Sequence, residues 1–188
     1  MTDLLVYLVV MSVTPGPNTI LSMANAAAVG FRRGIRLNLG MLAGITIVSL
    51  LSLLSLEILY AVIPQAETAM KLMAFVYLVY LAVRMLMTPV SEAEAAGQGF
   101  VKGLLLQLVN VKVYFLALTG LSSYIMPMEV SPAGRLALTM LIPLICFVSG
   151  LAWAIAGSLL SSAFTRHRRF FSLIFCLLLL WCAFRTVL

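Results

Sequence analysis

The chain has 188 residues, of which 63% are hydrophobic and only 10% are charged. Soluble domains carry about a quarter of charged residues, so this composition excludes an ordinary soluble protein. The formal net charge of +6 does not indicate nucleic-acid binding, because the basic residues cluster at the ends of apolar runs without interleaved aromatic residues. About 20 apolar residues cross the roughly 30 Å of hydrocarbon in a bilayer, and the sequence divides into six such runs. We therefore predict an all-α integral membrane protein with six transmembrane helices.

The first apolar run, about Leu4 to Met23, holds the sequence Thr-Pro-Gly-Pro-Asn at residues 14–18. Each proline removes a backbone donor and clashes with the carbonyl one turn earlier, so we predict that the first membrane helix is broken there. Interrupted backbone at membrane depth survives where protein buries it or where it lines a polar cavity. A simple proline kink is the alternative, but Thr14 and Asn18 supply polar groups that a kink does not need. The motif therefore predicts a binding site.

The second span, about Asn38 to Val62, contains Gly40 and Gly44 at the GxxxG spacing. Small residues at this spacing let the backbone of another helix approach closely, so we predict a tight helix contact here instead of glycines that face lipid. The segment before this span, Ala24 to Leu37, holds three arginines. Because cytoplasmic loops carry an excess of basic residues, we predict that this segment is a cytoplasmic loop.

The third span covers about Lys71 to Met87 and ends with two tyrosines and an arginine. A tyrosine serves either in the aromatic belt at the membrane interface or as a hydrogen-bond partner in a cavity. We expect the belt for Tyr80 and assign Tyr77 to the predicted site. The stretch from Thr88 to Gly99 is polar, contains proline and glycine, and is predicted to be a flexible linker. It divides the chain almost in half.

The fourth span begins near Gly103 and is unusually polar, since it contains Gln107, Asn110 and Lys112. About nine residues at 1.5 Å each place Lys112 roughly 14 Å deep, near the middle of the hydrocarbon. A charge at that depth costs about 2.5 to 3.5 kcal/mol, which implies an anionic partner or a wet cavity. Alternatively, the span begins nearer Gln107 and the lysine snorkels to the cytoplasmic face. Both interpretations stay open at this point.

A turn at Met126 to Glu129 precedes the fifth span, about Leu136 to Leu160, and the basic loop Arg166 to Arg169 precedes the sixth, Phe170 to Val187. Orientation follows Lys and Arg in short loops. One side of the membrane receives most of them, namely Arg32, Arg33, Arg36, Arg84, Lys102, Lys112, Arg166, Arg168 and Arg169. The other side receives Lys71, Arg135 and Arg185. This bias predicts that both termini are periplasmic.

Three spans in each half mean that any similarity between the halves has inverted topology. The third span ends in Tyr-Leu-Ala-Val-Arg at residues 80–84, and the sixth ends in Trp-Cys-Ala-Phe-Arg at residues 181–185. The polar stretch of the first span also corresponds to the polar stretch of the fourth. Interruptions in matching helices of inverted halves indicate the central site of a transporter. We therefore predict one transmembrane transporter domain, 1–188, built from inverted three-helix repeats at about 1–90 and 98–188.

These motifs, in this order, resemble the lysine-exporter (LysE/RhtB) superfamily of bacterial amino-acid exporters along essentially the whole chain. The stretches that carry the resemblance are residues 14–18, Gly30-Phe31-Arg32-Arg33-Gly34 with Gly40 beyond, Tyr77-Leu78-Val79-Tyr80-Leu81, and Phe100-x-x-Gly103 leading to Asn110-x-Lys112. The superfamily usually has proline where this chain has Val111. Valine there, with the surrounding sequence, looks like the cysteine and O-acetylserine exporter branch. We therefore expect a softer break in the fourth span than in the first.

The resemblance implies a secondary transporter that exports small neutral amino acids, such as cysteine or O-acetylserine, from the cytoplasm across the bacterial inner membrane. Alternating access is the expected mechanism, and coupling to protons is left open. An exporter of homoserine, threonine or other amino acids is an alternative, and so is a passive channel. An enzyme is not expected, because the sequence has no HExxH motif and no pair of intramembrane acids.

A zwitterionic amino acid brings a carboxylate and an ammonium group into a medium of low dielectric constant, so the site must offer donors and acceptors. Amides near the first break and Lys112 could take the carboxylate, while carbonyls freed by the prolines and the Asn110 side chain could take the ammonium. The predicted substrate-binding residues are Thr14, Pro15, Gly16, Pro17, Asn18, Tyr77, Gln107, Asn110 and Lys112. We expect no metal, cofactor or nucleic-acid partner, and we leave a homodimer open.

Overall fold

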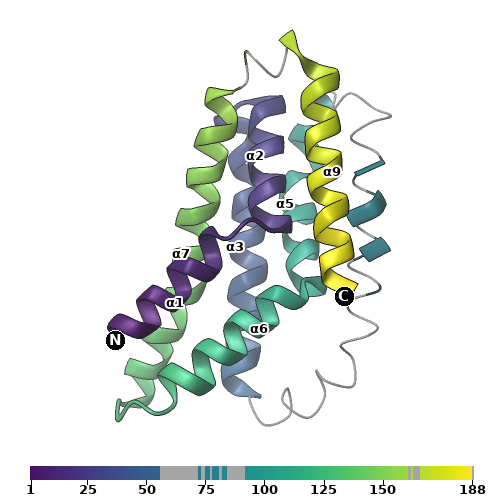
Figure 1. Ribbon diagram of the computed structural model, residues 1–188. Coiled ribbons are helices and arrows are strands. Elements are labelled where there is room, and N and C mark those ends of the chain that lie inside the picture. The colour runs from purple at the N-terminus through teal and green to yellow at the C-terminus, as the bar shows by residue number, and fades with distance from the viewer. Residues whose placement is uncertain are drawn as a thin grey trace.

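The computed structural model describes residues 1–55, 72, 75, 76, 78–80, 82, 83, 92–160, 162 and 166–187. All regular secondary structure in these residues is helical, as predicted (Figure 1). The elements are α1 (Thr2–Val13), α2 (Pro17–Val29), α3 (Phe31–Leu54), α5 (Glu92–Val109), α6 (Val111–Thr119), the π-helix η1 (Gly120–Ile125), α7 (Pro132–Leu159) and α9 (Arg168–Val187). Most of the predicted third span, including Tyr77, lies outside the described residues.

Two of the described helices, α3 and α7, are by themselves long and apolar enough to cross a membrane. Two further pairs meet the same criterion when each pair is counted as one bent span. These pairs are α1 with α2, and Gly99–Val109 of α5 with Val111–Ile125. The described part of the chain therefore contains between two and four candidate membrane spans by length and composition.

The first helix is broken between Val13 and Pro17, as the sequence predicts, and its two parts meet at 53°. Pro17 is the first residue of α2, a position where its missing N–H is not needed. Gly16 precedes it in a fully extended conformation, and Thr19 satisfies both polar groups of the Gly16 backbone. The Thr19 hydroxyl accepts from Gly16 N at 2.9 Å and donates to Gly16 O at 3.0 Å. The backbone groups that the break exposes at Gly16 are therefore satisfied by a residue only three positions away.

The second break, at Asn110, is sharper than the first, so the prediction of a softer break was wrong. The bend there is 63°, although no proline is present. Asn110 has an extended conformation and caps α6, since its side-chain oxygen accepts from the backbone N–H of Lys112 at 3.2 Å. An asparagine side chain that competes for a helix amide ends one helix and starts the next without a proline.

Two segments that the sequence suggested as connections are largely helical. The predicted loop from Ala24 to Leu37 is divided between α2 and α3, and Gly30 alone joins them with a φ of 80°. Alanine-rich sequence extends α2, and glycine adopts that left-handed conformation without a steric penalty. The second part of the predicted linker, from Glu92, likewise belongs to α5, whose first residues are mostly alanine and glutamate. The helices α3 and α5 therefore begin before the residues predicted to start the second and fourth spans.

Glycines bring α3 and α5 into close contact, which confirms the interpretation of the GxxxG spacing. A Cβ added to Gly40 would collide with the carbonyl of Phe100, and one added to Gly44 would lie 2.7 Å from Gln107 Cβ. From the other side, a Cβ on Gly103 would collide with the carbonyl of Leu37. Since each obstacle includes backbone or the stem of a buried side chain, the helices would have to separate to admit it.

Hydrophobic side chains from both broken helices share one core with α3 and α7. Leu4 and Leu8 of α1 pack with Val48 of α3, Leu116 of α6 and Ile142 of α7. A second cluster joins α2 to α9. The breaks are therefore held between long, continuous helices, which Figure 1 shows running alongside them.

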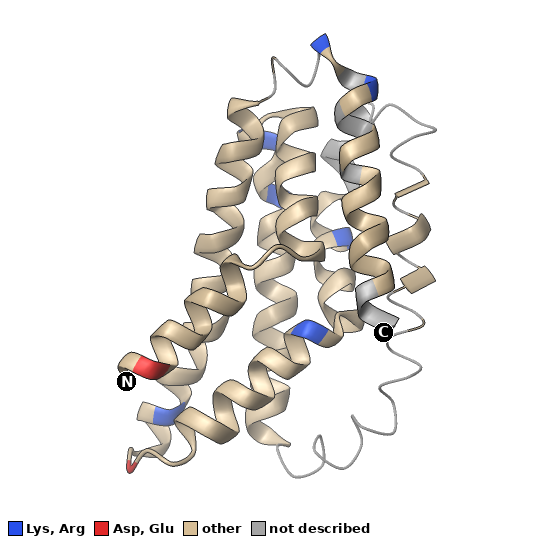
Figure 2. Cartoon of the chain, viewed as in Figure 1, with Lys and Arg blue, Asp and Glu red and all other residues tan. Residues whose placement is uncertain are grey.

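Charged residues gather at opposite ends of the molecule (Figure 2). The end where α3 and α9 begin carries Arg32, Arg33, Arg36, Arg166 and Arg169. Among the residues that the structure describes, the opposite end, where α1 and α7 begin, carries Asp3, Glu129 and Arg135.

We predict that Gly40→Ala lowers the stability of the folded protein by about 1 to 3 kcal/mol, because the added methyl group overpacks the α3–α5 contact. Thermal unfolding in detergent should show a lower midpoint than the parent. Gly120→Ala is the matched control, since an added Cβ there would meet its nearest neighbour at 3.6 Å. Equal midpoints for both variants would contradict the tight contact.

Candidate functional site

Three side-chain amides connect the two helix breaks directly. Asn18 donates from Nδ2 to Gln107 Oε1 at 2.8 Å, and Gln107 donates from Nε2 to Asn18 Oδ1 at 3.1 Å. Asn110 donates from Nδ2 to the same Asn18 oxygen at 3.0 Å. We refer to Asn18, Gln107 and Asn110 as the amide cluster. It joins residues about 90 positions apart in the sequence.

Each member of the amide cluster is placed by the end of a helix. Asn18 is the second residue of α2, Gln107 lies in the last turn of α5, and Asn110 caps α6. Gln107 is completely buried and also donates to Gly103 O at 3.3 Å. Because a buried amide without partners is costly, these bonds fix the two breaks against one another.

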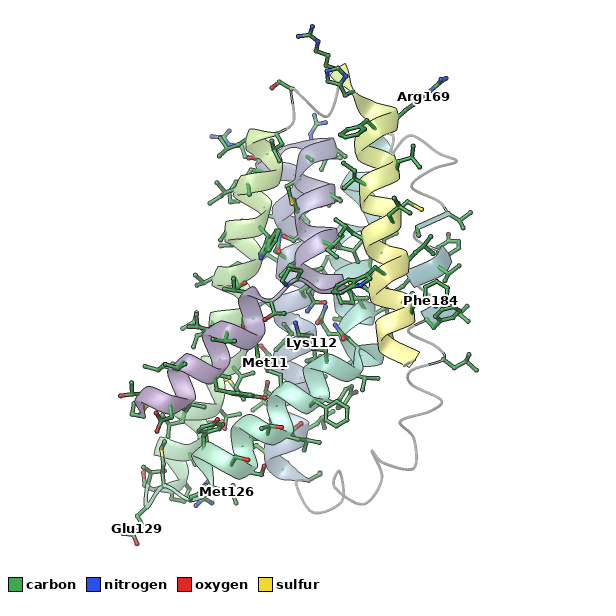
Figure 3. The ribbon with its side chains drawn as sticks, viewed as in Figure 1. Met11, Lys112, Met126, Glu129, Arg169 and Phe184 are labelled. Atoms are coloured by element: carbon green, nitrogen blue, oxygen red, sulfur yellow. The ribbon has the colours of Figure 1, made fainter. Side chains whose placement is uncertain are left out.

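Lys112 points from α6 toward the first break, between the two ends of the molecule (Figure 3). Its Nζ donates to the backbone carbonyl of Thr14 at 3.2 Å, and a Cβ on Gly16 would lie 3.3 Å from the same nitrogen. No carboxylate pairs with this lysine in the part of the chain that the structure describes. A carbonyl bears only a partial negative charge, so the positive charge at the break is incompletely balanced.

A cavity opens beside Lys112 and the amide cluster. Its walls come from α1, the first break, α2, α3, α6 and α7. The lining residues are Met11, Ser12, Thr14, Gly16, Pro17, Asn18, Thr19, Asn38, Met41, Leu42, Ile45, Asn110, Lys112, Val113, Leu116, Cys146, Phe147 and Gly150. The amino ends of α2 and α6 both border it. Since the amino end of a helix carries a partial positive charge, this cavity is suited to an anionic group.

A family model described as "LysE type translocator" matches residues 9–188 of the chain. The chain belongs to this family. It is therefore a multi-pass membrane translocator and not an enzyme. A cysteine/O-acetylserine efflux protein of Salmonella choleraesuis is 32% identical over 181 residues, which cover 95% of this chain and 93% of the relative. Its counterpart in Escherichia coli is 31% identical over the same lengths. No solved structure matches the chain.

The LysE-type chain brings most of the residues predicted for the site to the cavity. Six of them line it: Thr14, Gly16, Pro17, Asn18, Asn110 and Lys112. Gln107 does not line the cavity, but it forms a hydrogen bond with Asn18, which does. Pro15 is exposed and does not line the cavity, and Tyr77 lies outside the described residues.

The sequence analysis missed polar groups that other helices add to the cavity. Asn38 comes from α3, and Cys146 comes from α7. Cys146 Sγ lies 3.2 Å from Ser12 Oγ, and Ser149 donates to the Ser12 carbonyl at 2.9 Å. Asn38 could have been identified as a candidate from the sequence, because it is an asparagine at the edge of an apolar run. Serine and cysteine are common in buried helices, so the sequence offers little to single out the others.

We predict that Gln107→Leu destabilises the protein by about 1 to 3 kcal/mol, because it leaves the half-buried amide of Asn18 without a partner from Gln107. Thermal unfolding in detergent measures the change. Ser158→Ala is the control, because that hydroxyl bonds only within its own exposed helix turn, at Ile155 O. If both substitutions have the same small effect, the amide cluster does not stabilise the contact between the breaks.

Proposed function

We propose that this LysE-type translocator is a secondary transporter that exports small neutral amino acids, such as cysteine or O-acetylserine, across the bacterial inner membrane. The observation that carries the proposal is the position of Lys112. Its ammonium group lies at a helix break, beside a cavity, and donates to a backbone carbonyl among the described residues. The carboxylate of an amino acid supplies the charge that this position lacks.

Lys112 and the two helix amino ends together offer donors to a carboxylate. The ammonium nitrogen has three hydrogens, and Thr14 O takes one of them. The first amides of α2 lack carbonyl partners within their own helix. These donors bind any α-amino acid, so the side chain must be selected by the remaining walls of the cavity. The names of the relatives, cysteine/O-acetylserine efflux proteins, support a small neutral side chain.

The courses of the broken helices support an arrangement of inverted repeats. In Figure 1, α1 and α2 run from the end that holds the N-terminus toward the opposite end, whereas α5 and α6 run the other way. Each pair is broken near its middle, and the amide cluster joins the breaks. We propose six spans in two inverted repeats, residues 1–90 and 98–188, that rock against each other to expose the cavity alternately. The amide cluster would then be remade in each cycle.

The distribution of basic residues supports an orientation with both termini in the periplasm. The end of the molecule where α3 and α9 begin holds a cluster of arginines, and we place this end in the cytoplasm. Both ends of the chain lie toward the opposite side in Figure 1.

We expect a phosphatase fused after Leu188 to be active and a fluorescent protein fused there to be dark, because the C-terminus is periplasmic. Fusions truncated after Arg169 are the matched control and should show the reverse pattern. A bright fluorescent fusion and an inactive phosphatase at Leu188 would contradict the proposed orientation.

The function is tested by measuring uptake of a panel of amino acids into liposomes that contain the purified protein. We expect saturable uptake of L-cysteine or O-acetyl-L-serine by the parent. We expect Lys112→Met to reach normal abundance, because it removes a charge from the membrane interior, and to weaken binding by about tenfold or more because a charged hydrogen bond to the carboxylate is lost.

Lys112→Arg separates a binding role from a positional one. A lysine that only anchors the helix at the interface tolerates arginine, whereas a lysine in a small site does not, because the guanidinium is larger and planar. Unchanged binding by Lys112→Met would remove this residue from the site. Uptake by the parent that does not saturate would identify a passive channel instead.

A further inference from the structure

Asn38 is a buried amide on α3 that is only partly satisfied. Its side chain is 2% exposed and lines the cavity. Ser22 Oγ of α2 lies 2.8 Å from Asn38 Oδ1 and 2.7 Å from the carbonyl oxygen of Gly150 on α7. Asn38 Nδ2 has no hydrogen-bond partner among the described residues. Since nearly all buried polar side-chain atoms have partners, the exception calls for a ligand.

The number of hydrogens decides which atom of the Asn38 amide faces Ser22. A serine hydroxyl has one hydrogen, yet it lies between two oxygens that can only accept, on Gly150 and Asn38. A half-turn of the Asn38 amide exchanges its nitrogen and oxygen, and the network of partners determines the correct choice. Asn38 Nδ2 then donates to Ser22 Oγ, and Ser22 donates to the Gly150 carbonyl. Both short contacts become hydrogen bonds, and Asn38 Oδ1 becomes the buried atom without a partner.

An unpaired acceptor at this place adds to the acceptors of the cavity, several of which already accept hydrogen bonds. The oxygen of Asn110 already accepts from the Lys112 amide, and the oxygen of Asn18 accepts from two side-chain amides. The carbonyl of Thr14 accepts from Lys112 Nζ. The acceptors at the two breaks are thus engaged, whereas Lys112 and the helix amino ends supply donors. A zwitterion in this cavity requires an acceptor for its ammonium group.

We infer that Asn38 Oδ1 binds the α-ammonium group of the transported amino acid, with Ser22 holding the Asn38 amide in the required orientation. This inference rests on the proposed function, because it concerns the same cavity and substrate class. Lys112 and Asn38 then divide the two charged groups of the substrate between the two halves of the chain. Asn38 recognises what distinguishes an amino acid from a simple carboxylic acid, and it thereby contributes to specificity.

The experiment compares L-cysteine with 3-mercaptopropionate, which has the same thiol and carboxylate but lacks the ammonium group. Affinities are measured on the purified protein in liposomes under a reductant. For Asn38→Leu we expect L-cysteine to bind about tenfold more weakly or worse, while 3-mercaptopropionate changes by less than about twofold, since only a bond to a charged group is lost. Asn38→Asp keeps an acceptor and should retain the preference for L-cysteine.

Asn25→Leu is the matched control, because Asn25 lies on α2, donates to Gly34 O at 3.3 Å and does not line the cavity. It should leave both affinities unchanged. Equal weakening of both ligands by Asn38→Leu, or no weakening of either, would overturn the inference while leaving amino-acid export by the parent intact. Loss of L-cysteine binding by a folded Asn38→Asp protein would show that the substrate needs a donor at this position and not an acceptor, and would overturn it as well. A parent that binds neither these two ligands nor O-acetyl-L-serine would refute the proposed function itself, and this inference with it.

Discussion

Every backbone N–H and C=O in the interior of a membrane must find a partner inside the protein, because hydrocarbon offers none. This chain breaks two of its candidate membrane spans and therefore frees such groups at both places. Thr19 satisfies the backbone of Gly16, Asn110 caps the helix that follows it, and Lys112 donates to the carbonyl of Thr14. Much of the site consists of the side chains that make these hydrogen bonds. The groups that complete the broken backbone are also the groups that face the cavity.

Close helix packing allows hydrogen bonds to form between the two halves of the chain. Gly40, Gly44 and Gly103 allow α3 and α5 to approach until backbone touches backbone. This contact places Gln107 within hydrogen-bond distance of Asn18. A larger residue at any of the three glycines would move the second break away from the first. The geometry of the polar site therefore depends on the close contact between α3 and α5.

The cavity combines donors from the helix breaks with polar groups from the continuous helices α3 and α7. The donors lie on helices that begin at the breaks, whereas Asn38 and Cys146 lie within the continuous helices α3 and α7. The two kinds of helix thus contribute different polar groups to one cavity.

The sequence by itself determined the helical class, the membrane setting, the break at residues 14–18 and the glycine contact of the second span, because hydrophobic composition, proline chemistry and glycine spacing act locally. The presence of proline did not by itself decide where a helix breaks. Pro143 lies within the continuous helix α7, whereas the sharper break occurs at Asn110 without any proline, because a side chain that caps a helix amide depends on what surrounds it. Asn38 became part of the site only through the tertiary structure. Its unpaired amide atom arises because Ser22, from another helix, has only one hydrogen and the carbonyl of Gly150 accepts it, and no local pattern encodes that encounter.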